Sequence, residues 1–287
     1  MHQVLIATKP VTAGKNATLI FDDGQGSLHS YALRKGEAIS LSVLATEKKF
    51  CQGWYDIELH QNFSCGGRAV VDAKFDSCYD CRSRTGFNPG FYNSATISPK
   101  QAEYNSRPHT VYAAYFGNGL YKAGIFSDSR GLDRIYEQGA IYYAIAERAK
   151  DAYDAHALEE RLIGQGLRNS VSKGQKQASY ERLSELDDLS SRQAFKDKLA
   201  TLELPRDLLI STTLDVFFFG DRPTQIITTV KDTNISGNIK GLVGSYLVVE
   251  NNDRLFGVWL SKLCGYKVEV GQDLKAMDAG PVQHSLF

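Results

Sequence analysis

Four of the five cysteines lie between positions 51 and 81, and such a density of thiols is typical of a metal site. Cys78 and Cys81 form a CxxC pair, in which a tight turn lets two thiolates face the same ion. Cys51 and Cys65 complete a set of four thiolates, the usual ligand set of a structural zinc. His60 lies between them and is an alternative to one thiolate. The sequence therefore predicts a structural Zn²⁺ held by these cysteines.

Two other interpretations of the cysteines stay open. A redox dithiol at Cys78 and Cys81 would need a thioredoxin-like setting, with the pair opening a helix after a strand. The flanking residues 74–77 and 82–86 do not form that setting. The thiols could also carry no ligand at all. Cys264 stands far from the cluster, and we expect it to be an ordinary buried cysteine.

The segment between positions 109 and 163 predicts an ordered series of short elements. A glycine-rich turn at 117–119 separates two apolar runs, which indicates a β-hairpin. The series as a whole reads strand, turn, strand, helix, strand, helix, at residues 110–116, 117–119, 120–126, 127–138, 140–146 and 154–163. With Tyr112, Gly124, Arg134 and Glu159 at their places in it, this layout resembles the GIY-YIG nuclease superfamily.

The resemblance implies a phosphodiester-cleaving site. Tyr112 would be the base or the water-positioning group, and Arg134 would hold the phosphate through its planar guanidinium. Glu159, or its neighbour Glu160, would bind a catalytic Mg²⁺ or Mn²⁺ through oxygen. Lys122 stands where the superfamily usually has a second tyrosine. The interval from arginine to glutamate is also short for that superfamily, so the resemblance implies the fold more directly than the activity.

Most of the chain also resembles an uncharacterised bacterial family, a domain of unknown function that carries a cysteine cluster before a GIY-YIG-like core. This resemblance implies the zinc site and the fold, and it implies no reaction. The matching segments are Cys51–Asp56, Cys78–Cys81, Arg84–Pro89, Phe91–Asn93, Lys122–Ile125, Arg134–Ala140 and Gly241–Leu247.

Each candidate residue also has an ordinary structural interpretation. Tyr112 is one of fifteen tyrosines, and a tyrosine on a strand most often packs in a core. Arg134 could form a surface ion pair with Glu137, which is three residues further on. Lys122 could protect a sheet edge, and Glu159 could belong to a solvated helix face.

A run of four cations without an acid follows the last of these helices, between positions 161 and 178. Its glycines and serines predict a mobile loop. The run is either a contact for the phosphate backbone of a nucleic acid or a plain solvated loop. The four cations are Arg161, Arg168, Lys173 and Lys176.

The predicted helices and strands that must position these residues indicate an α+β fold, which divides the chain into four stretches. Short apolar or alternating runs make residues 1–50 and 201–287 β-rich, and we expect these two regions to pack on each other. Residues 51–108 form the zinc-binding cysteine region, and residues 109–200 form the GIY-YIG-like module inserted between the β regions. Within that module, a further helix is predicted over residues 180–199.

Composition excludes several classes of protein. With 287 residues, of which 43% are hydrophobic, the chain is not disordered as a whole. No apolar run approaches the ~20 residues that span a bilayer, and no secretory signal opens the sequence, so we expect a cytoplasmic protein without a membrane partner. The 33 basic residues match the 33 acidic ones, so a nucleic-acid partner must be recognised locally.

The leading functional hypothesis is a nucleic-acid-processing protein. Its specific form is a divalent-metal-dependent endonuclease, with DNA favoured over RNA as the substrate. One alternative is a catalytically silent module that binds nucleic acid or protein, in which Lys122 adds charge in place of the lost tyrosine. Another is a zinc-stabilised adaptor for a protein partner, without nucleic acid.

Overall fold

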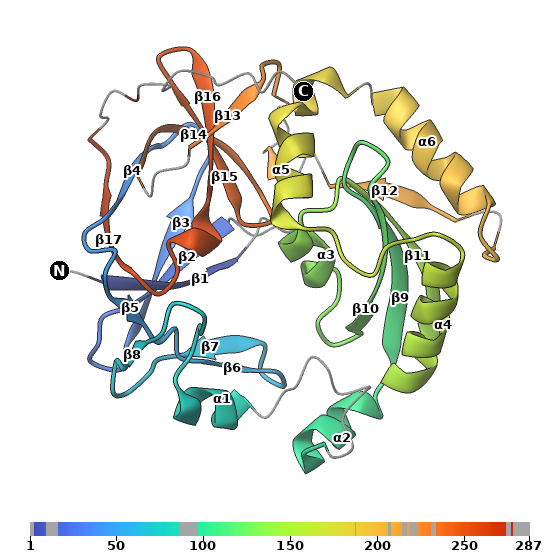
Figure 1. The fold of residues 1–287 in the computed structure, drawn as a ribbon, viewed down its shortest axis with the longest axis horizontal. Coiled ribbons are helices and arrows are strands. Elements are labelled where there is room, and N and C mark those ends of the chain that lie inside the picture. The colour runs from blue at the N-terminus through green and yellow to red at the C-terminus, as the bar shows by residue number, and fades with distance from the viewer. Residues whose placement is uncertain are drawn as a thin grey trace.

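The computed structural model describes residues 3–9, 17–85, 97–186, 188–205, 208–213, 217–218, 223–230, 234–273 and 277. Helices and strands are both present, so the predicted α+β class is confirmed. Figure 1 shows two β layers side by side, with helices between them and at the outer edge of the second layer. None of the helices in the described part of the chain has the length and hydropathy needed to cross a bilayer.

The larger sheet has nine strands in the order β13-β16-β15-β14-β4-β17-β1-β2-β3. Neighbouring strands are antiparallel except β13 and β16, which are parallel. The strands come from both ends of the chain, which confirms that the two β regions pack on each other. In chain order they are β1 (Gln3–Lys9), β2 (Ala17–Asp22), β3 (Leu28–Leu33), β4 (Ala38–Val43), β13 (Ile227–Thr229), β14 (Ile235–Val243), β15 (Tyr246–Asn251), β16 (Arg254–Trp259) and β17 (Lys267–Gly271).

The smaller sheet has four strands in the order β10-β9-β11-β12. They are β9 (His109–Tyr115), β10 (Tyr121–Ser127), β11 (Tyr142–Ala149) and β12 (Ile210–Thr212). The predicted hairpin is present, because β9 and β10 are antiparallel and pair Tyr112 with Gly124. β12 lies in the stretch assigned to the C-terminal β region, yet it pairs with β11 of this central sheet.

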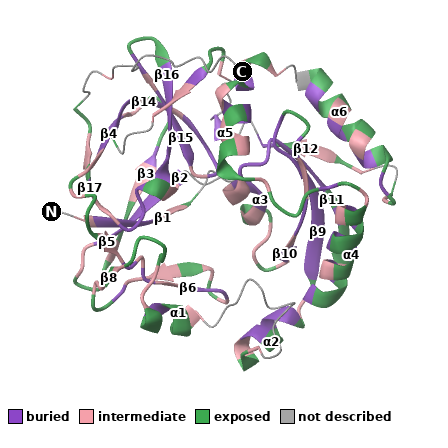
Figure 2. Ribbon diagram, in the orientation of Figure 1, coloured by how far each residue is buried: buried purple, intermediate pink, exposed green. Residues whose placement is uncertain are grey.

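Apolar side chains on both faces of β9 explain why this strand is buried along its whole length (Figure 2). Val111, Ala113 and Tyr115 belong to a core that also contains Leu158. The alternate residues, Tyr112 among them, belong to a separate core. The helices around this sheet are α3 (Asp133–Gln138), α4 (Ala152–Gly164), α5 (Lys173–Glu181) and α6 (Asp188–Ala200).

Two of these helices join the sheets. α3 contacts β14 and α5 contacts β13, and both helices lie between the two sheets (Figure 1). The hydroxyl of Tyr180 on α5 donates a 2.6 Å hydrogen bond to the carbonyl of Gly139 at the end of α3. α4 packs against β9, β10 and β11. One side of α3 therefore packs on the larger sheet, and Gln138 at its end reaches Tyr112 of β9.

The cysteine region is built from very short elements beside the larger sheet. Two small antiparallel pairs are formed by β5 (Lys49–Phe50) with β8 (Val70–Val71) and by β6 (Trp54–Asp56) with β7 (Gln61–Phe63). They are followed by α1 (Tyr79–Thr85) and α2 (Pro99–Asn105).

Three local predictions were wrong. The helix expected over 127–138 is confined to α3, because residues 128–132 form turns before it. The single helix expected over 180–199 is divided into the end of α5, a 3₁₀ turn, η2 (Leu183–Glu185), and α6. The stretch 161–178, expected to be one mobile loop, contains the end of α4 and the start of α5. Ser172 begins α5 with a reciprocal capping box to Gln175, a signal that is visible in the sequence.

Candidate functional site

The sulfur atoms of Cys51, Cys65, Cys78 and Cys81 all lie within 4.8 Å of one another. Four sulfurs placed tetrahedrally at about 2.3 Å from an ion would be about 3.8 Å apart, so the cluster could hold one metal ion. The four residues come from three separate places: the end of β5, the end of β7 and the start of α1. The prediction that these cysteines gather at one metal-binding position is confirmed.

Backbone N–H groups point at the sulfur atoms. Gly53 and Cys78 donate to Cys51 Sγ at 3.3 and 3.1 Å. Burial pushes the pKa of the Cys65 thiol upward, but backbone donors at Ala69 and Gly67, together with hydrogen bonds to Cys51 and Cys81, leave that pKa below its usual value. Such donors stabilise thiolates, the form that binds a metal. A redox dithiol would not require a pocket of this kind around all the sulfurs.

Gly53 donates to the cluster from a position where the backbone of β7 passes very close, and this residue was not identified from the sequence. Its φ is +78°, in the left-handed region, and a Cβ atom there would lie 1.9 Å from the carbonyl oxygen of Phe63. The residue therefore cannot carry a side chain where β6 and β7 meet. Glycines shortly after a metal-binding cysteine could have indicated this role, as in Cys-x-Gly at 51–53 and Cys-Gly-Gly at 65–67.

His60 is not part of the cluster, so its assignment as an alternative ligand was wrong. Its Nε2 atom lies 3.1 Å from Ser129 Oγ, and its Nδ1 atom lies 3.4 Å from the Tyr55 hydroxyl. Ser129 precedes α3, so the tip of the β6–β7 hairpin contacts the loop that leads into that helix. The cysteine region thereby adjoins the second group of candidate residues.

Tyr112 lies in the middle of β9 and is fully buried, with 0% of its surface exposed. Its ring lies against Gly124 of β10, where a Cβ atom would be 2.4 Å from Tyr112 Cζ. Gln138 Nε2 donates a 2.8 Å hydrogen bond to its hydroxyl oxygen. Burial raises the pKa of Tyr112 to about 12, so the neutral phenol is the form present at neutral pH.

Lys122, Arg134 and Glu159 lie close enough to Tyr112 to interact with it or with one another. Lys122 Nζ lies 5.9 Å from the centre of the Tyr112 ring. Burial lowers the pKa of Lys122 to about 8, the Glu159 carboxylate opposes this shift, and the Arg134 guanidinium adds to it. The same carboxylate and guanidinium also influence the Tyr112 hydroxyl. The structure thus brings the four predicted catalytic residues together from β9, β10, α3 and α4.

The surroundings distinguish between the two glutamates considered for this site. Glu159 is buried, and its Oε2 atom lies 3.4 Å from His156 Nδ1. Glu160 is exposed. Arg134 keeps 41% of its side chain exposed, and its Nη1 atom is 3.9 Å from Glu137 Oε2. Arg134 is therefore more open to a molecule from solution than Glu159.

Lys176 is an additional member of the site. Its ammonium donates a 2.7 Å hydrogen bond to the carbonyl of Gln138 and lies 4.6 Å from the centre of the Phe116 ring. Burial, followed by the charges of Lys122 and Arg134, lowers its pKa to about 8. The other predicted cations are exposed: Arg161, Arg168 and Lys173. Lys173 donates to Ser261 Oγ at 2.8 Å, and Arg168 bridges to Lys122 through the backbone.

We name Tyr112, Lys122, Arg134, Glu159 and Lys176 the central cluster. It has three cationic side chains, whereas Glu159 is the carboxylate whose charge acts on Lys122. The site fits an anion well. It fits a divalent ion less well, because within the described residues the four cysteines form the sole group of three or more potential metal ligands. Comparison of the chain with family models, with curated proteins and with solved structures gave no match.

Proposed function

We propose that the chain binds a nucleic-acid phosphate at the central cluster and hydrolyses a phosphodiester bond there, with a structural Zn²⁺ at the cysteines. The observation that carries this proposal is the excess of positive charge around Lys122. Two ammonium groups whose pKa values are lowered by burial lie within electrostatic reach of each other and of Arg134. Buried cations without matched anions are unfavourable, and a bound phosphate would relieve that penalty.

Each side chain has a distinct role in the proposed reaction. Arg134, which is partly exposed, binds a phosphate oxygen, and its planar fork suits that contact. Lys122 and Lys176 add positive charge where negative charge develops on the phosphate. Tyr112 acts as a positioning group that is held by Gln138, because its buried neutral phenol is a poor base.

A divalent ion would depend on Glu159. Mg²⁺ commonly binds one or two carboxylates together with substrate phosphates and water, so a single protein carboxylate is compatible with it once a phosphate is present. Mg²⁺ or Mn²⁺ there would offset the charge that develops during hydrolysis and activate water. His156 Nδ1 lies 3.4 Å from Oε2 of this carboxylate.

The second candidate function is a binding module without catalysis. The specific observation in its favour is the complete burial of Tyr112, which keeps the phenol from direct contact with a bulk water molecule. In this alternative the same cations bind the phosphate backbone and no bond is cleaved. If the chain were instead an adaptor for a protein partner, these cations would have no role in binding nucleic acid.

A cleavage assay with matched variants tests the proposal. The protein is incubated with plasmid DNA, single-stranded DNA and RNA, with Mg²⁺, Mn²⁺ or chelator. Glu159→Gln should lower the cleavage rate at least about 100-fold, as removal of a charge-stabilising group does in other enzymes. Glu160→Gln is the matched control, because it removes an adjacent but exposed carboxylate, and it should leave the rate unchanged.

Binding measurements separate the two candidates. Arg134→Ala should weaken binding of each substrate at least about tenfold, since a charge-assisted contact contributes about 1.5–3 kcal/mol. Lys122→Met and Lys176→Met should each reduce the salt dependence of binding by about one unit of slope. Binding without cleavage would select the silent module. Cleavage that Glu159→Gln and Arg134→Ala leave intact, or no binding at any salt concentration, would reject the central cluster as a nucleic-acid site.

A further inference from the structure

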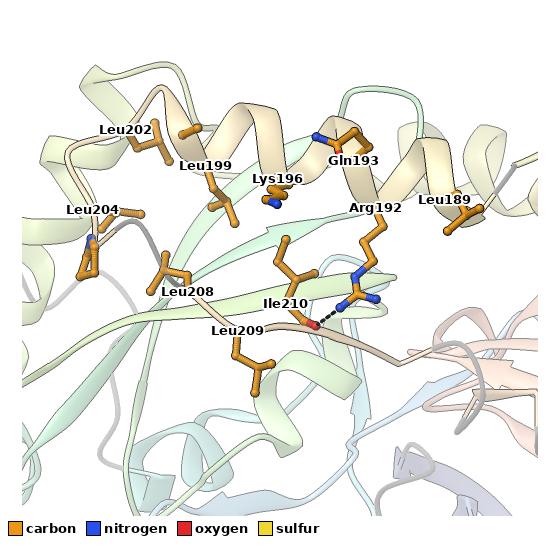
Figure 3. Close-up of a pocket in the computed structure, with 12 residues that line it drawn as sticks. Leu189, Arg192, Gln193, Lys196, Leu199, Leu202, Leu204, Leu208, Leu209 and Ile210 are labelled. Carbon is orange, nitrogen blue, oxygen red and sulfur yellow. Dashed lines mark hydrogen bonds between the residues drawn. The ribbon is translucent and has the colours of Figure 1, made fainter.

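A cavity of about 750 Å³ lies between α6 and the segment that leads into β12 (Figure 3). It shares no residue with the cysteines or with the central cluster. α6 supplies one wall through Leu189, Arg192, Gln193, Lys196, Leu199 and Ala200. The facing wall consists of Leu202, Leu204, Pro205, Leu208, Leu209 and Ile210.

The α6 wall is formed by one face of the helix. Leu189, Arg192, Lys196 and Leu199 are three or four residues apart, so they point in the same direction. Leu189 is 77% exposed and Leu209 is 78% exposed, so large apolar groups at the cavity face solvent. The apolar surface is therefore still available to a ligand.

The cations of the cavity lack an acidic partner among the described residues that line it. Arg192 Nη2 donates a long 3.5 Å hydrogen bond to the Ile210 carbonyl, as Figure 3 shows. The neighbouring carboxylate of Asp197 on α6 accepts a 2.6 Å hydrogen bond from Gln193. Because the described lining contains two cations and no carboxylate, it is electrostatically complementary to an anion.

Four of the leucines lie on one side of the two cations. In Figure 3, Leu199, Leu202, Leu204 and Leu208 gather toward one end and Lys196 lies in the middle. Arg192 lies toward the other end, between Ile210 and Leu189. A ligand that matches this arrangement has a hydrocarbon part and a single anionic end. The volume falls within the range of about 300–1,000 Å³ that is typical of small-molecule sites, which favours one small amphiphile over a protein segment.

We propose that this cavity binds a free long-chain carboxylate, with the acyl chain among the leucines and the carboxylate at Arg192 and Lys196. Burial of the methylene groups supplies most of the affinity. The guanidinium and the ammonium replace water at the carboxylate, and this replacement gives selectivity over a neutral molecule with the same chain. The inference is independent of the proposed activity, because no residue is shared.

Calorimetry on the full-length protein with decanoate and 1-decanol tests this inference. Decanoate should bind with one site per chain and at least about tenfold more tightly than decanol, because a charge-assisted hydrogen bond contributes more than a neutral one. In the double variant Arg192→Gln, Lys196→Gln, decanoate should lose about tenfold in affinity whereas decanol should be unaffected. Lys48→Gln, which removes an exposed cation outside the cavity, is the control for net charge.

A cavity-filling variant locates the binding. Ala200 is exposed at the end of α6 and lines the cavity, so Ala200→Trp should occupy the space without disturbing the core. It should abolish decanoate binding while the melting temperature stays the same. The proposal is overturned if decanoate fails to bind, if both ligands bind equally, or if Ala200→Trp still binds decanoate with the wild-type affinity. Binding to phosphatidylglycerol vesicles but not to monomeric decanoate would overturn it as well.

Discussion

Gln138 Nε2, at the end of α3, donates a 2.8 Å hydrogen bond to the hydroxyl oxygen of Tyr112 in the middle of β9. This contact joins residues 26 positions apart and fixes the helix against the sheet. The Gln138 carbonyl accepts a hydrogen bond from Lys176, so one residue links β9, α3 and α5. The central cluster is organised around this glutamine.

A double-mutant cycle on Tyr112 and Gln138 should reveal their coupling. Gln138→Leu removes the donor, and Tyr112→Phe removes the acceptor. Each change should lower the free energy of unfolding by about 1–2 kcal/mol, because a buried polar group is left without its partner. The double variant should be more stable than the sum of the single effects predicts, by about 1 kcal/mol. Urea denaturation measures all four proteins, and strictly additive effects would contradict the observed contact.

Gly124 should not tolerate alanine. A Cβ atom at this position would lie 2.4 Å from Tyr112 Cζ, and the buried ring has no room to move away. Gly124→Ala should destabilise the protein by about 1–3 kcal/mol or more. The matched control is Gly164→Ala at the end of α4, where a Cβ atom meets nothing within 4 Å. The control should be neutral or slightly stabilising in the same thermal-denaturation experiment.

Lys122 should make stability depend on pH in the alkaline range. Its pKa is lowered from 10.5 to about 8 in the folded protein, so between these pH values the unfolded chain binds more protons. Stability therefore rises with pH across this interval, and the penalty is fully present below pH 8. Lys122→Met should stabilise the protein by up to about 3 kcal/mol at neutral pH.

The difference between wild type and Lys122→Met should shrink as the pH approaches 10. Denaturation at a series of pH values measures this difference, and tyrosine titration largely cancels because both proteins contain the same tyrosines. Lys173→Met is the matched control, since Lys173 is exposed on α5. A constant difference between pH 7 and pH 10 would show that the Lys122 ammonium is well solvated.

The cysteine cluster should contain close to one zinc ion per chain when the protein is purified without added metal. Cys78→Ser should reduce the zinc content sharply and lower the melting temperature, since metal binding contributes directly to the folding of small thiolate-bound regions. Cys264→Ala should keep the zinc, because Cys264 is buried in the core of the larger sheet. Mass spectrometry of metals and melting curves with and without a chelator measure both effects. Wild-type protein without bound metal would remove the zinc assignment.

Local signals in the sequence predicted the positions of most elements that carry the site. Gly117, Asn118 and Gly119 indicated the hairpin of β9 and β10, and the structure has it. Gly139, a residue type that commonly ends helices, follows the predicted helix of Arg134, and it ends α3 with a left-handed φ of 75°. Neighbouring residues of a strand point to opposite faces, so Tyr121 points away from Lys122, and its ring stacks on Tyr115 in the other core.

Longer-range relationships were not predictable from the same signals. Lys176 was grouped with exposed cations of a loop, and the fold instead places its ammonium on the Gln138 carbonyl. Nothing within a few residues of Lys176 specifies that contact, because it depends on how α5 packs between the two sheets. The leucine-lined cavity depends likewise on the position of residues 202–205 and 208–210 beside α6.

The sequence by itself determined which chemistry was available: four thiols for one soft metal ion, and a tyrosine, a lysine, an arginine and a glutamate on short elements of known type. These follow from residue identity and from periodicities of two and 3.6 residues, which are local properties of the chain. The tertiary structure alone decided that Tyr112 is sealed from solvent, that Glu159 faces inward while Glu160 does not, and that His60 contacts Ser129. Burial and pKa depend on every segment packed around a side chain, and those segments are distant in sequence.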